Sequence, residues 1–302
     1  MSSLKELNEK LNLNIRGYRE LNNVKIIDTD NGKFVIKKNT ADDNLYNYLT
    51  SKNFNYILSK KKIDNYDLFP YVDEISMPDD EKAIELVYIL SLLHNKTTFY
   101  KEVVLDKTKE TYESLNNEID YLGRYYYELQ DMIEQKIYMS PGEYLLIRNI
   151  SLIYSALQYA KVNLDKWYEI KKAQKKERVV LLHNKPSLEH ILIGNTSQLI
   201  SWNNYKRDIP IYDFIYFYKK DYLKLEMSTL FDIYQSKFMY TDDEMLLFLS
   251  IISIPKKITF SDTNYNNCYK IYELIRYMEM TRDFVLKENE KRKKENEDEF
   301  YE

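Results

Sequence analysis

The fold of this 302-residue chain is decided by residues 179–213, which read VVLLHNKPSLEHILIGNTSQLISWNNYKRDIPIYD. Four apolar residues, 179–182, have the length and β-branched content of a buried strand. A polar segment from His183 to His190 follows, and then a short apolar run that ends at Gly194. Residues 198–202 predict another strand, and residues 210–213 lead into an apolar helix. The stretch therefore alternates strand, loop, strand, turn, strand, loop and helix.

That order is how an active-site hairpin is laid out in a kinase-like C-terminal lobe. The residues resemble the catalytic core of the aminoglycoside phosphotransferase and choline-kinase-like family. The family motif is His-Gly-Asp, four variable residues, Asn and two apolar residues, followed later by Ile-Asp-Trp. In this chain His183-Asn184-Lys185 stands at the first motif, His190 at the Asn position and Ile200-Ser201-Trp202 at the second motif.

The resemblance implies roles for the three chemical positions of the motif. The first Asp would accept the proton of the substrate hydroxyl, and the Asn and the second Asp would hold Mg²⁺ on the phosphates. Here Lys185, His190 and Ser201 occupy these positions. Magnesium prefers oxygen ligands in octahedral geometry, so a histidine nitrogen and a neutral hydroxyl are poor substitutes. A protonated lysine accepts no proton.

We therefore expect no catalytic residues and no metal site in this segment. Losing two carboxylates and gaining one ammonium shifts the local charge by three units toward positive, which repels Mg²⁺. The nearby carboxylates are Glu189 and Asp208, and Glu189 is expected to face solvent rather than to rescue the metal site. The resemblance still implies structural roles: His183 ties the loop to the core, Trp202 fills the pocket floor and Asp213 braces the loop.

A β-hairpin is predicted near the N-terminus. Residues 23–28 and 33–37 have strand character, and the Asn31-Gly32 pair between them is a strong turn signal. The hairpin resembles that of the subgroup associated with bacterial spore coats, which implies that Lys37 is the strand lysine that pairs with nucleotide phosphates. The alternative is that Lys37 belongs to a solvated strand end.

Most of the remaining chain is predicted to be helical. Residues 66–75, with Pro70, are interpreted as the crossover into the second lobe. His94 is expected to pack at a helix end rather than to bind a ligand, and the tyrosines at 125–127 either line an acceptor pocket or pack. Asp42 and Asp43 are interpreted as helix caps, where a kinase would carry a glutamate. The predicted helices are residues 1–16, 42–52, 78–94, 107–137, 144–175, 214–238, 242–252 and 264–290.

Composition limits the class of protein. Hydrophobic residues at 44% and charged residues at 30% indicate a soluble globular protein. The net charge of −4 argues against a nucleic-acid partner, and the single cysteine, Cys268, excludes an internal disulfide framework and a cysteine-rich zinc site. We expect no signal peptide and no membrane span, and hence a cytoplasmic protein. With five glycines in the chain, no Walker A or Gly-x-Gly-x-x-Gly loop can be written.

We predict an α+β, two-lobed, protein-kinase-like fold with a small β-sheet-bearing lobe at 1–75, a helical lobe at 76–286 and a charged tail at 287–302. The predicted function is a catalytically degenerate pseudokinase that acts as a binding or scaffold module, in sporulation if the subgroup resemblance holds. The alternatives are an active small-molecule phosphotransferase with atypical residues, or a shared fold whose function lies on another surface.

No cofactor is expected in the altered cleft. Lys37 and Lys185 should converge there and favour weak, metal-independent binding of a nucleotide or phosphate. The alternative is a cleft occluded by Trp202 or a neighbouring tyrosine. The partner, a protein or a small phosphate-bearing ligand, is not identified by the sequence.

Overall fold

The computed structural model describes residues 14–21, 24–37, 42–63, 66–261 and 263–301. The chain forms two compact units, each discontinuous in sequence. The first unit contains Met1–Thr98, Val180–Asp208 and Leu230–Phe238, and the second contains Phe99–Val179, Ile209–Thr229 and Met239–Glu302. The lobe boundaries at residues 75 and 286 stay a prediction.

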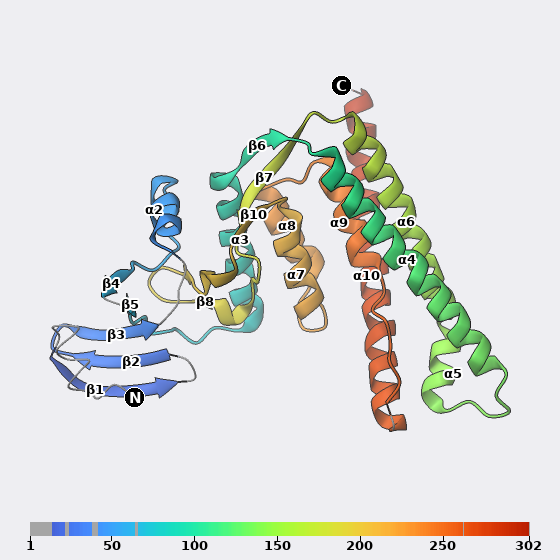
Figure 1. The fold of residues 1–302 in the computed structure, drawn as a ribbon, viewed down its shortest axis with the longest axis horizontal. Helices are drawn as coiled ribbons and strands as arrows, with labels where there is room; N and C mark the ends of the chain where they lie inside the picture. Colours follow the sequence, from blue (N-terminus) through green and yellow to red (C-terminus); the bar gives the residue numbers. More distant parts are fainter. Residues whose placement is uncertain (1–13, 22–23, 38–41, 64–65, 262, 302) are drawn as a thin grey trace. The chain divides into compact units, whose positions relative to one another are not determined.

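An antiparallel five-stranded sheet forms the start of the first unit, with strand order β1-β2-β3-β5-β4 (Figure 1). The strands are β1 (Ile15–Leu21), β2 (Val24–Thr29), β3 (Gly32–Lys37), β4 (Lys61–Ile63) and β5 (Tyr66–Pro70). The predicted hairpin is confirmed, with Thr29 paired to Gly32 at its turn. Gly32 has φ of 107°, a left-handed conformation that only glycine adopts without strain. Buried Ile27, Ile36 and Leu68 form the core of the sheet.

Two predictions for this region are wrong. Residues 1–13 lie outside the described part of the chain, but Ile15 already begins β1, so the helix expected up to residue 16 does not reach that far. Residues 66–70 are a strand paired with β3 and β4, not the start of a crossover. Pro70 is tolerated because it is the last residue of β5, where a missing N–H removes little of the strand pairing.

Two helices complete the N-terminal part of the first unit. Asp42 caps α2 (Asp43–Ser51) because its Oδ1 accepts a hydrogen bond from the backbone N–H of Leu45 at 3.0 Å. The longer α3 (Asp79–Thr97) follows Pro78 and buries the predicted apolar stripe. His94 is fully buried, lies 2.5 Å from the Tyr234 hydroxyl and contacts the Phe238 ring, so it packs as expected.

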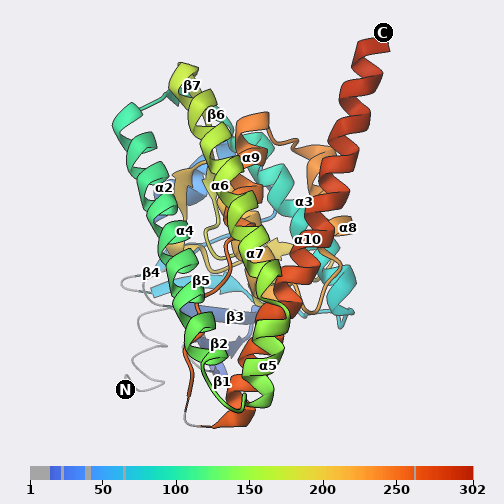
Figure 2. The same ribbon diagram turned by 90° about the vertical axis from the view of Figure 1, so that its right-hand side faces the viewer.

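The second unit is mostly helical. Its helices are α4 (Leu105–Glu134), α5 (Pro141–Arg148), α6 (Ile150–Ala173), α7 (Ile211–Asp221), α9 (Asp242–Ser253) and α10 (Asn264–Tyr301), and α8 (Met227–Lys237) begins in this unit and ends in the first. In Figure 2, α6 runs between α4 and α10. None of the described helices is long and apolar enough to cross a membrane.

Helix boundaries in this unit differ from the prediction at three places. The helix expected over 144–175 is interrupted at Asn149, and the helix expected over 214–238 is interrupted after Asp221. Helix α10 continues past residue 290 to Tyr301. Its later turns are anchored in the fold, because Glu288 is 4% exposed and Arg292 forms an ion pair with Asp242 at 2.5 Å.

Strand β7 (Lys176–Leu182) passes from the second unit into the first. Its first half pairs with β6 (Phe99–Glu102), and its second half pairs with β10 (Lys206–Asp208). In the second unit a buried Lys171 binds Glu177 and Asp243 at 3.2 and 3.3 Å, and Arg178 pairs with Glu244. These ion pairs fix the start of the strand that carries the His183 loop.

Candidate functional site in the first unit

The loop after β7 is held by its first residue. His183 is completely buried, and its Nε2 lies 2.7 Å from the Ile200 carbonyl oxygen. Because a carbonyl only accepts hydrogen bonds, this nitrogen carries the proton and donates. The imidazole ring also packs edge-on against the Trp202 indole, with ring centroids 5.0 Å apart. His183 thus connects the two motif segments, 183–185 and 200–202.

Lys185 and His190, which align with two positions of the family motif, are joined by a hydrogen bond between the His190 side chain and the Lys185 backbone. The Nδ1 of His190 lies 2.7 Å from the Lys185 carbonyl oxygen and donates to it, which leaves Nε2 as the nitrogen with the lone pair. The Lys185 side chain is exposed. Asn184 between His183 and Lys185 has φ of 68°, a conformation that asparagine tolerates better than most residues. The loop keeps a tight, defined shape without a carboxylate at its tip.

The second motif follows a two-stranded ribbon, β8 (Ile191–Leu192) and β9 (Gln198–Leu199). Ser201 lies just after β9 in the left-handed region, with φ of 67° and ψ of 47°. Trp202 is 2% exposed, donates from Nε1 to the Leu199 carbonyl at 2.9 Å and contacts the edge of the Phe54 ring. The indole is therefore a packed component of the loop core.

Three contacts within the first unit fix this ribbon against residues 54–75. The Ile75 N–H donates to the Ile193 carbonyl, and the Leu199 N–H donates to the Tyr56 carbonyl, both at 2.8 Å. A Cβ at Gly194 would lie only 2.8 Å from Val72 Cγ1, so this close approach needs glycine. The ribbon after the His183 loop and the segment after the sheet are therefore parts of one packed body.

Lys37 ends β3, half-buried, with Asp67 opposite it on β5. Burial lowers the pKa of Lys37, because the charged ammonium is partly removed from water. The side-chain ammonium of Lys37 makes no hydrogen bond or ion pair with any residue that the structure describes. An anion in contact with this ammonium would therefore offset its loss of hydration.

The first carboxylate of α2 is engaged by a different lysine. Lys60 Nζ lies 2.6 Å from Asp43 Oδ1 and 3.6 Å from Asp67 Oδ1, and its side chain is 5% exposed. The hydrogen bond from Lys60 is the main cause of the lowered pKa of Asp43. Asp43 was expected to act as a cap, but the cap of α2 is Asp42, and Asp43 forms this ion pair instead. The role of Lys60 could not be predicted from the lysine run that contains it, because the adjacent Lys61 and Lys62 are both exposed.

The donor atoms near the loop do not form a group suited to a metal ion. Within the part of the chain that the structure describes, no three His, Cys, Asp or Glu side chains lie together so that they could hold one. Glu189 is exposed, and Asp208 on β10 forms an ion pair with Lys206 at 3.2 Å. An imidazole nitrogen, as in His190, and a hydroxyl, as in Ser201, are ligands that Mg²⁺ does not prefer.

The predicted site residues are distributed over both units. His183, Lys185, His190, Ser201 and Trp202 lie on one loop system of the first unit, which also contains Lys37. Asp213 is completely buried in the first turn of α7, in the second unit. The bracing role of Asp213 and the convergence of Lys37 with Lys185 stay predictions.

The fold is similar to those of several solved phosphotransferase and kinase structures. An aminoglycoside phosphotransferase from Alicyclobacillus acidocaldarius is similar with a TM-score of 0.66 and 9% identity, over 95% of this chain and 97% of that one. A spectinomycin phosphotransferase bound to AMP has a TM-score of 0.53 and 10% identity, over 92% and 96% of the two chains. A glucosamine kinase bound to glucosamine, ADP and inorganic phosphate has a TM-score of 0.50 and 9% identity, over 93% and 82%.

No protein-family model and no curated relative matches the sequence. At 9–10% identity the structural matches describe the fold alone. They agree with the antiparallel N-terminal sheet and the helical remainder described above. The chain therefore has a two-lobed, kinase-like α+β fold, similar to that of the aminoglycoside phosphotransferase from Alicyclobacillus acidocaldarius.

Proposed function

We propose that this chain is a catalytically degenerate kinase-like protein that binds a ligand or partner and does not transfer phosphate. One observation carries the proposal. The loop keeps its backbone supports, His183 and Trp202, while Lys185, His190 and Ser201 stand where phosphoryl transfer needs a carboxylate, an amide and a second carboxylate.

The side chains present cannot perform the two essential tasks of the reaction. A general base must accept the proton of the attacking hydroxyl, and the Lys185 ammonium has no lone pair for it. A magnesium site needs oxygen ligands that neutralise its charge, and the charge at these positions has moved by three units in the opposite direction. The altered loop is better suited to a bare anion than to a metal–nucleotide complex.

Lys37 is the residue that we assign to ligand binding. Its ammonium is half-buried and has no ionic partner among the described residues, since Lys60 takes up the carboxylates of Asp43 and Asp67. We expect weak nucleotide or phosphate binding that does not require a metal and that weakens as salt is added. The alternative is a cleft too occluded to bind.

Calorimetric titration with ATP, first in EDTA and then in Mg²⁺, tests the proposal. We expect equal, weak affinity in both buffers and loss of binding in Lys37→Ala. Lys33→Ala is the matched control, because Lys33 lies on the same strand and the same face of β3, is exposed, and should bind ATP like the unmodified chain. Binding that requires Mg²⁺ would contradict the proposal, and absence of binding in both buffers would support an occluded scaffold.

The second candidate is an active small-molecule phosphotransferase with atypical residues. It is supported by the structural neighbours, which are a spectinomycin phosphotransferase, an aminoglycoside phosphotransferase and a glucosamine kinase. Phosphate transfer from ATP to aminoglycosides, choline or simple sugars is therefore assayed in parallel. Mg²⁺-dependent turnover that survives repeated purification, and that is lost in Glu189→Gln or Asp208→Asn, would favour this candidate. A role in sporulation rests on the subgroup resemblance alone.

A further inference from the structure

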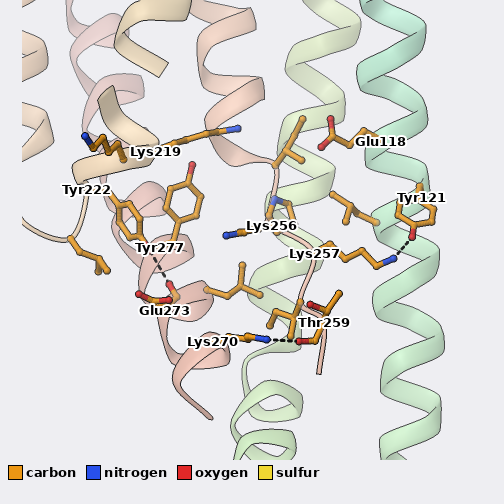
Figure 3. A pocket seen from close by; sticks show the side chains of 17 residues that line it. Glu118, Tyr121, Lys219, Tyr222, Lys256, Lys257, Thr259, Lys270, Glu273 and Tyr277 are labelled. Atoms are coloured by element: carbon orange, nitrogen blue, oxygen red, sulfur yellow. Dashed lines mark hydrogen bonds between the residues drawn. The ribbon is translucent and has the colours of Figure 1, made fainter. Parts of the chain in front are cut away.

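The second unit contains a cavity that shares no residue with the His183 loop or with β3. Its volume is about 730 Å³, within the range of small-molecule sites. The walls come from α4, the end of α7 and the residues just after it, the segment 254–259 and α10 (Figure 3). These parts of the sequence are up to about 160 residues apart, so only the tertiary fold brings them together.

The charge of the lining is strongly positive. Five lysines face the cavity, and they are Lys219, Lys220, Lys256, Lys257 and Lys270. Two glutamates, Glu118 and Glu273, oppose them, which leaves a formal excess of three positive charges. The whole chain has a net charge of −4, so this concentration of lysine is local and not a consequence of composition. A multiply charged anion would relieve the repulsion among the ammonium groups.

The lysines are not equally engaged with the protein. Lys257 donates to the Tyr121 hydroxyl and lies over the Tyr121 and Tyr125 rings, 4.8 and 4.5 Å from their centroids. Lys270 donates to the Thr259 carbonyl at 3.0 Å. The side-chain ammonium of Lys256 makes no hydrogen bond or ion pair with any residue that the structure describes, and in Figure 3 it points away from Lys257 toward the Tyr277 side. Lys256 is therefore the natural anchor for an anion.

The backbone that carries Lys256 is fixed by buried tyrosines. Tyr126 on α4 donates from its hydroxyl to the Lys256 carbonyl at 2.5 Å, and Tyr125 donates to the Ile258 carbonyl. Tyr277 on α10 donates to the Ile252 carbonyl at 2.6 Å. Two hydroxyl groups from α4 thus hold the segment and a third, from α10, holds the end of α9 just before it, so the segment is ordered before a ligand binds.

One wall of the cavity is apolar and aromatic. Leu122, Ile254 and Leu274 contribute aliphatic surface, and the Tyr222 and Tyr277 rings meet edge to face with centroids 4.6 Å apart. An apolar or aromatic ring of a ligand would be removed from water against this wall. The lysine ammonium groups of the lining are point-charge donors suited to phosphate.

We propose that this lysine-rich cavity binds a small organic phosphate that carries two negative charges or more next to an apolar or aromatic ring. Lys256 contacts the phosphate, and the wall of Leu274, Tyr222 and Tyr277 covers the ring. This site is independent of the proposed nucleotide-binding role of Lys37, because it contains none of the residues assigned to that role.

Calorimetric titration of the full chain with phenyl phosphate, pyrophosphate and phenol tests the proposal. We expect phenyl phosphate to bind tightest, pyrophosphate more weakly and phenol not measurably, with affinity that falls as salt rises. Lys256→Ala should weaken phenyl phosphate binding by about tenfold or more, as is typical when a charged hydrogen-bonding partner is lost. Lys166→Ala, an exposed lysine of α6 outside the lining, is the matched control and should change affinity less than twofold.

Lys256→Ala preserves the backbone carbonyl to which Tyr126 donates, so its thermal melting should match that of the unmodified chain. Two further variants are measured in parallel. Lys219→Ala removes a positive charge from another wall of the cavity. Lys37→Ala should bind phenyl phosphate normally. Loss of binding in Lys37→Ala would place the anion elsewhere and overturn the proposal. Equal effects of Lys256→Ala and Lys166→Ala, or no saturable binding by any of the three probes, would overturn it as well.

Discussion

Replacing Lys60 by methionine should destabilise the first unit by about 2–3 kcal/mol. At an effective dielectric constant near 20, the 3.6 Å separation of Lys60 and Asp67 corresponds to about 5 kcal/mol of attraction before the cost of burying the charges is subtracted. Breaking a fully buried ion pair costs about 3–5 kcal/mol. The expected loss is smaller, because Asp67 makes other interactions and methionine still packs on the Tyr46 ring that Lys60 now contacts at 4.7 Å.

Urea denaturation followed by circular dichroism at pH 7 measures this loss. Lys61→Met, at the adjacent exposed position, is the control and is expected to change stability by less than about 0.5 kcal/mol. Adding Asp67→Asn to Lys60→Met should recover stability, because it removes the unbalanced buried carboxylate. The pKa of Asp43, held low by Lys60, should rise toward its ordinary value in Lys60→Met. A Lys60→Met variant as stable as Lys61→Met, or a further loss in the double variant, would refute this reasoning.

Three other predictions follow from the contacts described. Trp202→Ala should cost about 3–5 kcal/mol in urea denaturation, because it empties a buried ring site, and a loss below about 1 kcal/mol would contradict the packing. Burial alone would raise the pKa of Glu143, but hydrogen bonds from Lys136 and from the backbone of its helix cap lower it. Glu143→Gln should therefore reduce the free energy of unfolding by about 1 kcal/mol or less at pH 7. The free energies of unfolding of the variant and the unmodified chain should converge as the pH falls below the ordinary value of 4.5 and through the lowered pKa. Lys185→Asp combined with Ser201→Asp should bind Mg²⁺ at least tenfold more tightly by calorimetry, and unchanged Mg²⁺ affinity would mean that the loop does not bring these positions together.

Local signals account for the parts of the fold that were predicted correctly. The hairpin was predicted from the two-residue Asn31-Gly32 turn signal. The buried face of α3 was predicted from the helical spacing of its apolar residues. The strand 66–70 was missed because it is short, lacks alternation and ends in Pro70. The break between α5 and α6 at Asn149 has no proline or glycine that would predict it, so tertiary packing rather than local helix propensity determines where the helix is interrupted.

The candidate site was predictable only as far as a motif could be aligned. The spacing of His183, His190 and Trp202 located the loop, and the structure shows how its backbone is held. The partner of the α2 carboxylate was not predictable, because Lys60 lies in a lysine run with no pattern that distinguishes a buried member. Nor could the lysine-rich cavity be predicted, since its walls come from four separate parts of the chain.

The left-handed conformations of Asn184 and Ser201 have a consequence for how this loop can change. Both residues have φ close to 67°, where β-branched or bulky residues are strained but Gly, Asn and Asp are tolerated. The backbone thus limits the repertoire at these two positions to a few residue types, and aspartate is among them at 201. A substitution to aspartate at 201 would therefore change the chemistry of the loop without changing its backbone conformation. The backbone shape of the loop and the chemistry of its side chains can therefore change independently of each other.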